Sequence, residues 1–192
     1  MRGTLVATVA LLALGCAGCS DAGSHRADND APTSEASDTA TPRSVATPAP
    51  RKVVAKGVPS ASASAAARAV GEAMAGINQA LVAPDKAAST LRDDLVAGAA
   101  REAVLAQAAE YADNGWQVSG EPRIVRMVVR PRGDLLRVRA CVDQSDVVVT
   151  DATGKKLPRG AQGDRTWMVL TLSPVDKGWR VTDQTFPDHP DC

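Results

Sequence analysis

Residues 123–143 read RIVRMVVRPRGDLLRVRACVD, and apolar residues alternate with arginines along most of this stretch. Alternation with a period of two predicts strands, and the turn at 131–134 predicts a hairpin in which Arg130 pairs with Leu135. In this register one face is wholly apolar: Val125, Met127, Val129, Leu136, Val138, Ala140 and Val142. The other face carries Ile124, Arg126, Val128, Arg130, Leu135, Arg137, Arg139 and Cys141. A slip of one residue would mix the two sets, so the pattern favours this register.

Helical patterns precede this hairpin. One apolar stripe ends before Pro84 and another ends at Asn114-Gly115, a pair typical of a left-handed helix cap. The first stripe consists of Val70, Met74, Ile77 and Leu81, and the second of Ala100, Val104, Ala108 and Tyr111. Between them, residues 90–93 resemble a capping box that would start a helix, which Gly98 would interrupt.

Strand patterns make up the rest of the chain. Four strands are expected near 123–130, 135–149, 165–173 and 179–185, with turn-rich segments between them. Helices followed by a run of strands predict an α+β fold. We therefore expect N-terminal helices packed on one face of a four-stranded antiparallel meander, within a domain that spans residues 61–192.

The first 18 residues have the pattern of a signal peptide. Arg2 precedes the apolar run TLVATVALLAL at 4–14, and small residues with two cysteines follow. The run is shorter than the roughly 20 residues that a transmembrane helix needs. A small residue before a cysteine resembles the lipobox of bacterial lipoproteins, which predicts cleavage before Cys16 or Cys19 and a lipid such as palmitate on that cysteine.

The choice between the two cysteines stays open. Cys16 follows the more usual apolar context, whereas lipidation of Cys19 would leave no spare thiol outside the cell. An ordinary cleaved signal without a lipid is the third alternative. The first two predict a protein on the extracellular face of the cell membrane, held there by its lipid anchor.

Residues 19–60 are rich in Ala, Ser, Thr and Pro and contain five acidic and five basic residues. Such a composition buries too little apolar surface to offset its ordering entropy, so we expect a disordered tether. A flexible chain of this length spans roughly 35 Å on average.

Composition excludes several functional classes. The chain has 192 residues, 22 Lys+Arg and 22 Asp+Glu, and only two histidines. A zero net charge argues against a basic nucleic-acid-binding protein, and two distant histidines argue against a histidine metal site or a Ser-His-Asp triad. The sequence contains none of the HExxH, GxSxG, Walker or dinucleotide-binding motifs, so it predicts neither a metal nor a cofactor.

Two cysteines remain within the expected domain, Cys141 and Cys192. In an oxidising compartment their pairing is the simplest interpretation. The bridge would close a loop of about 50 residues, for about 4 kcal/mol in the chain-entropy model, and would hold the tail 186–190 across the sheet. The alternative is a catalytic Cys141 with His189 as its base.

Six arginines lie between Arg123 and Arg139, with Asp134 as the single acid among them. Guanidinium groups suit phosphate and carboxylate recognition. The outward-facing members Arg126, Arg130, Arg137 and Arg139 are therefore candidates for binding an anionic polymer or an envelope protein. The alternative is a solvated face that is salt-bridged to helix or strand acids. The lack of aromatic residues between these arginines argues against nucleic acid.

One carboxylate is a candidate for catalysis. Asp143 lies along the second expected strand, and a carboxyl group with a raised pKa in an apolar cavity can act as a general base. This hypothesis predicts a hollow fold with Asp143 pointing inward.

Several short motifs carry a resemblance to a known family. They are YADNGW at 111–116, RACVD at 139–143, DATGK at 151–155, GWRV at 178–181 and the terminal Cys192. Together they resemble small secreted lipoproteins of high-GC Gram-positive bacteria with a nuclear transport factor 2-like domain. The resemblance implies three helices around a curved, cone-shaped sheet, in a superfamily that includes isomerases, cyclases and non-catalytic binding domains. We expect a lipid-anchored domain with a binding or scaffolding role in the envelope, and as the alternative a small-molecule pocket or an isomerase- or cyclase-like enzyme that uses Asp143.

Overall fold

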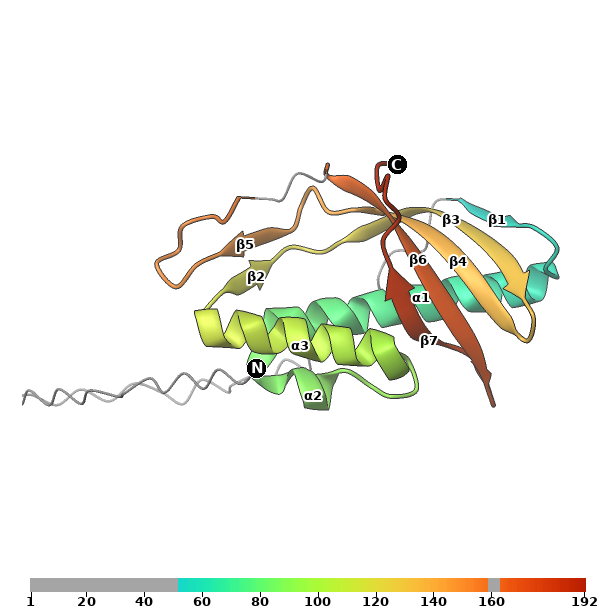
Figure 1. The fold of residues 1–192 in the computed structure, drawn as a ribbon, viewed down its shortest axis with the longest axis horizontal. Helices are drawn as coiled ribbons and strands as arrows, with labels where there is room; N and C mark the ends of the chain where they lie inside the picture. The colour runs from blue at the N-terminus through green and yellow to red at the C-terminus, as the bar shows by residue number, and fades with distance from the viewer. Residues whose placement is uncertain (1–51, 159–162) are drawn as a thin grey trace, which may run out of the picture. The chain divides into compact units, whose positions relative to one another are not determined.

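The computed structural model describes residues 52–158 and 163–192, and Figure 1 shows their arrangement. The predicted signal peptide, Cys16, Cys19 and the tether up to residue 51 lie outside the described residues. The helices are α1 Ser60–Val82, α2 Ala87–Thr90 and α3 Gly98–Asn114, with a short 3-10 turn at Pro84–Lys86. The strands are β1 Val53–Ala55, β2 Gln117–Ser119, β3 Arg123–Arg132, β4 Leu135–Asp143, β5 Val148–Thr150, β6 Arg165–Val175 and β7 Gly178–Thr185.

Five of these strands form one mostly antiparallel sheet in the order β1-β3-β4-β6-β7. The pairs β3–β4, β4–β6 and β6–β7 are antiparallel, whereas β1 runs parallel to β3 at the edge. Helices α1 and α3 lie side by side against one face of this sheet (Figure 1). The predicted α+β class with helices packed on the sheet is confirmed.

The expected strand 135–149 is two strands in two different sheets. Strand β4 ends at Asp143, and β5 pairs with β2, which was not predicted, in a separate two-stranded ribbon. A turn closed by a hydrogen bond from the Val147 N–H to the Gln144 carbonyl separates β4 from β5. At Gly120, after β2, a Cβ atom would lie 1.9 Å from the Asp146 carbonyl oxygen, so this close approach of two backbones requires glycine.

The segment 52–60 belongs to the fold, although the sequence predicted that the tether continued to residue 60. The Lys56 N–H donates to the Val129 carbonyl, and the Met127 N–H donates to the Lys52 carbonyl. These bonds fasten β1 to β3. The prediction failed because the average composition of the tether hides Val53-Val54, a β-branched pair that suits an edge strand.

The hairpin β3–β4 keeps its predicted faces in a different register. Arg132, not Arg130, pairs with Leu135, so the turn is Gly133-Asp134 with Gly133 at a φ of 60°. A shift of two residues leaves every side chain on its predicted face. A bulge between Ile124 and Arg126 is the exception, since it turns Ile124 into the core in place of Val125.

The predicted helices are present, but the segment between them differs. Helix α1 ends before Pro84, and α3 ends at Gly115, which has a φ of 64°. Gly98 begins α3 rather than interrupting a helix, and no helix starts at the expected capping box. The reason is a main-chain pairing: Ala97 donates to the Val181 carbonyl and Val181 to the Leu95 carbonyl, which extends the sheet edge beyond β7.

The core lies between the helices and the inner face of the sheet. The sheet contributes fully buried side chains, among them Met127, Val129, Val138, Val142, Leu170 and Leu172. Helix α1 presents a face of small residues and Val70, which lets its backbone lie close to the strands. In the part of the chain that the structure describes, no helix combines the length and the apolar character that crossing a membrane requires.

Candidate anion-binding site

The outer face of the sheet gathers the four arginines that the sequence singled out. Arg126 and Arg130 project from β3, and Arg137 and Arg139 project from the neighbouring β4. All four side chains line one groove of about 560 Å³. Arg130 and Arg137 are directly opposite each other in the ladder, an arrangement of like charges that costs stability.

Two further features complete this groove, which we call the arginine groove. Lys56, which follows β1, adds a fifth cation to its wall. The remaining lining residues are Val128, Trp167, Val169 and Pro187. The groove therefore combines cationic side chains with apolar ones, and among the described residues no carboxylate lines it.

Trp167 organises two of the arginines. The guanidinium carbon of Arg139 lies 4.7 Å from the centre of the indole ring, and that of Arg126 lies 5.9 Å from it. Cation–π contacts of this kind hold a guanidinium group by its flat face. The N–H groups at the edge of the guanidinium stay available for an anion, which they can bind in a bidentate manner.

The arginines of the groove have no acidic partner among the residues that the structure describes. The ion pairs found in this part of the chain are Arg92–Asp94, Arg101–Asp93, Arg123–Asp146 and Arg165–Asp143. Within residues 52–158 and 163–192 the salt bridges of the alternative are therefore not found for these four arginines, whereas their side chains are exposed to solvent. The positive charge of the groove arginines is therefore not neutralised by an ion pair with any acidic side chain of these segments.

The C-terminal tail forms one wall of the arginine groove. Cys141 and Cys192 form the predicted disulfide, with 5.9 Å between their Cα atoms. The Trp167 N–H donates to the Pro190 carbonyl, and Asp191 forms a bridge with Thr166 on β6. The disulfide and these main-chain contacts thus fix the tail beside Trp167 and hold Pro187 at the groove. Because Cys141 is oxidised and buried, the alternative of a catalytic thiol is wrong.

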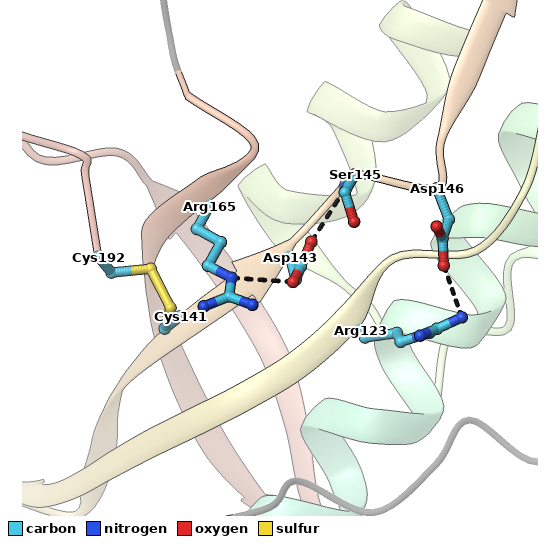
Figure 2. A network of polar contacts seen from close by, with 7 residues as sticks. All are labelled: Arg123, Cys141, Asp143, Ser145, Asp146, Arg165 and Cys192. Atoms are coloured by element: carbon cyan, nitrogen blue, oxygen red, sulfur yellow. Dashed lines mark hydrogen bonds and ion pairs between the residues drawn. A yellow bond between two sulfur atoms is a disulfide. The ribbon is translucent and has the colours of Figure 1, made fainter.

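Asp143 does not occupy an apolar cavity. Figure 2 shows its carboxylate pointing toward Ser145 and Arg165. The Ser145 N–H donates to it over 3.0 Å and the Arg165 guanidinium over 2.9 Å. The Ser145 hydroxyl and N–H, followed by Arg165, lower the pKa of Asp143 to about 2. Such a weakly basic carboxylate is unsuited to general base catalysis at neutral pH, so the predicted role of Asp143 is not supported.

The nearby Asp146 also has a structural role. Its carboxylate is 2.5 Å from the Arg123 guanidinium, which joins the turn after β4 to the start of β3 (Figure 2). Arg123, though part of the same run of six arginines, is thereby excluded from the arginine groove.

A second hollow of about 440 Å³ lies beside the β2–β5 ribbon. Tyr111 and Trp116, at the end of α3, form part of its wall, and their rings meet edge to face at 5.5 Å. Polar groups of Gln144, Lys156 and Asp164 also line it. Asp143 is not among its lining residues.

Sequence reasoning missed four lining residues of the arginine groove, namely Lys56, Trp167, Val169 and Pro187. Lys56 was assigned to the tether, and Trp167 was expected only as part of a strand. The alternation of side chains along β6 could have indicated the position of Trp167. Trp167 lies two residues before Val169, and therefore on the same face, and it pairs with Cys141 of β4. The position of Pro187 follows from the disulfide, which the sequence did predict.

Comparison of the sequence with protein-family models and with curated proteins finds no match. Among solved structures, the chain is similar to the crystal structure of the intermembrane space region of the chloroplast protein ARC6. The sequences are 15% identical, the similarity covers 63% of this chain and 92% of that chain, and the TM-score is 0.38.

Proposed function

We propose that this chain is a lipid-anchored, extracytoplasmic binding protein that holds an anionic partner of the cell envelope in its arginine groove. In this proposal it binds or scaffolds that partner and does not catalyse a reaction. One observation carries the proposal: five cationic side chains line a single groove, and no carboxylate of residues 52–158 and 163–192 lines it.

The location in the envelope has separate support. Disulfides form and persist in oxidising compartments, and the described domain holds the Cys141–Cys192 bridge. The signal-like sequence ending in Cys16 and Cys19 fits a lipoprotein. Mass spectrometry of the mature amino terminus tests the anchor: a diacylated Cys16 or Cys19 supports it, and an unmodified terminus contradicts it.

The relation to nuclear transport factor 2-like domains remains part of the proposal. The order of the three helices before β2–β7 and the packing of α1 and α3 on the sheet are compatible with such a domain. An experimental structure that superimposes on this superfamily over the whole domain would support the assignment.

Sedimentation with isolated cell envelopes tests the binding role. The chain from Ser20 onward lacks both candidate lipid sites, so any sedimentation depends on the protein surface. We expect salt-sensitive sedimentation of this chain and none for the triple variant Arg126→Glu, Arg137→Glu, Arg139→Glu. Arg68→Glu, an exposed charge reversal on α1, is the matched control and should sediment like the unmodified chain. Equal sedimentation of the triple variant and the control contradicts the proposal.

The second hollow supports an alternative function, the binding of a small apolar molecule. Trp116 in its wall provides a reporter, because the other tryptophans, Trp167 and Trp179, do not line it. Saturable quenching of Trp116 fluorescence by an apolar probe, lost in Trp116→Phe, would favour this alternative. Asp143 does not line this hollow, and in this alternative the site binds its ligand without chemistry.

A further inference from the structure

We infer that the occupant of the arginine groove is a linear polyphosphate, a chain of phosphate groups without nucleosides. This inference rests on the proposed function, since it names the chemistry of the anion that the groove holds. The inference depends on the hydrogen-bond donors and acceptors that the lining residues of the groove provide.

The side chains of the groove offer hydrogen-bond donors and no acceptors. Lysine and arginine carry only N–H groups, the indole of Trp167 is also only a donor, and the other lining residues are apolar. A ligand rich in its own donors, such as a sugar with free hydroxyls, would leave those donors unpaired. A phosphate chain presents only acceptor oxygens and matches this inventory.

The backbone of the groove floor is already paired. Strand β4 has a neighbour on both sides, β3 also pairs with β1 at Met127–Val129, and β6 also pairs with β7 from Val169 onward. Before Val169, the main-chain N–H of Trp167 donates to the Pro190 carbonyl. Their N–H and C=O groups therefore point along the sheet rather than out of it. A peptide bound by its main chain needs such groups from an open edge, so an acidic peptide fits this surface less well than a phosphate chain.

The arginines extend along two neighbouring strands, with Arg130 and Arg137 opposite each other. Arg137 and Arg139 are two residues apart on β4, about 6.7 Å along the strand, and Arg126 and Arg130 are about 13 Å apart on β3. Lys56 and Pro187 come from opposite edges of the sheet and border a hollow. A concave groove can hold a polymer chain, whereas binding to a flat bilayer requires a flat or protruding surface.

Trp167 does not act as a stacking platform for bases. Arg126 and Arg139 both lie over its ring, so the aromatic surface is used by the protein's own guanidinium groups. Nucleic-acid grooves expose aromatic faces on which successive bases stack. The groove therefore fits the phosphates of a chain and not nucleobases.

Isothermal titration of the chain 20–192 with linear polyphosphate tests the inference. We expect saturable binding that weakens with salt, with a slope of log K against log salt of about −3 for four phosphate contacts on a flexible strand. Arg139→Gln should reduce the steepness of that slope by about 0.7. Arg137→Glu with Arg139→Glu should weaken binding at least 100-fold, while Arg68→Glu should weaken it less than twofold.

Three matched probes separate this inference from the proposed function. They are poly-glutamate of equal charge, oligothymidylate of equal phosphate number, and vesicles of phosphatidylglycerol. Arginine-dependent binding that is tighter for any of these than for polyphosphate overturns the inference and leaves an anion-binding groove in place. No arginine-dependent binding to any probe, together with unaltered envelope sedimentation of the triple variant, overturns both.

Discussion

The two faces of one sheet differ in almost every property although the same strands make both. On the inner face of β4, Val138, Ala140 and Val142 are fully buried beneath the helices. On the outer face of the same strand, Arg137 and Arg139 stay exposed, and Arg139 lies over the indole ring of Trp167. The alternation of strand side chains thus places a hydrophobic core and a cationic groove on opposite sides of a single layer.

Because alternate residues of a strand lie on opposite faces, residues that determine stability can be separated from residues that determine binding. Inner-face substitutions should change the free energy of unfolding, and outer-face substitutions should change affinity for anions. The opposed pair Arg130 and Arg137 shows the distinction most clearly, because like charges in register oppose folding and favour an anion between them.

Removing the disulfide should give the largest change in the free energy of unfolding. The disulfide is an exception to the separation of the two faces, because it stabilises the fold from the outer face. Cys192→Ser should lower the free energy of unfolding by about 4 kcal/mol, the chain-entropy expectation for a loop of this length. It should also weaken anion binding, since Pro187 loses its fixed position at the groove. Urea unfolding and titration of the same sample measure both effects. Unaltered affinity would remove the tail from the binding surface.

An inner-face truncation should affect stability alone. Leu172 is fully buried on β6, so Leu172→Ala should cost about 3 kcal/mol through lost burial and the cavity that remains. The folded fraction should bind polyphosphate as before. A loss of affinity measured under conditions where the variant is folded would break the separation between the two faces.

The outer-face pair provides the opposite case. Arg137→Glu places an acid opposite Arg130, so the free energy of unfolding should stay within about 0.5 kcal/mol of its original value or rise slightly. Binding of anions should fall about tenfold or more, as expected when a charge-assisted hydrogen bond is lost. Destabilisation by more than about 2 kcal/mol would mean that this arginine is structural.

Lowering the pH should have the smallest effect on the free energy of unfolding. This effect arises at the end of β4 rather than on either face of the sheet. Because the pKa of Asp143 is lowered from 3.8 to about 2, its ionised form stabilises the fold above about pH 4. That contribution, about 1 kcal/mol for a largely solvated ion pair, should be lost as the pH falls through about 2. Asp143→Asn should flatten this part of the pH profile of urea unfolding. An unaltered profile would show that Ser145 and Arg165 contribute nothing.

Much of this architecture could be predicted from sequence because it depends on local periodicity. The hairpin faces, the ends of both long helices and the disulfide each follow from residues close to one another or from cysteine parity. The hairpin register could be wrong by two residues without consequence for the faces, since both registers bury Val129 and Val138.

The parts that could not be predicted depend on pairing at long range. Strand β1 is too short to be recognised alone and exists because β3 offers it an edge. The break before Gly98 arises because Leu95 and Ala97 bond to Val181, more than 80 residues later. Trp167 joined the arginine groove for the same reason, because β6 pairs with β4.

The most direct measurement of the central claim combines two readouts on Arg137→Glu with Arg139→Glu. Titration with linear polyphosphate and urea unfolding are performed on this variant, on Arg68→Glu and on the unmodified chain. The account predicts at least a 100-fold loss of affinity in the double variant, with a free energy of unfolding within about 0.5 kcal/mol of the unmodified chain. An affinity equal to that of Arg68→Glu would contradict the claim that the outer face of this sheet is a binding surface.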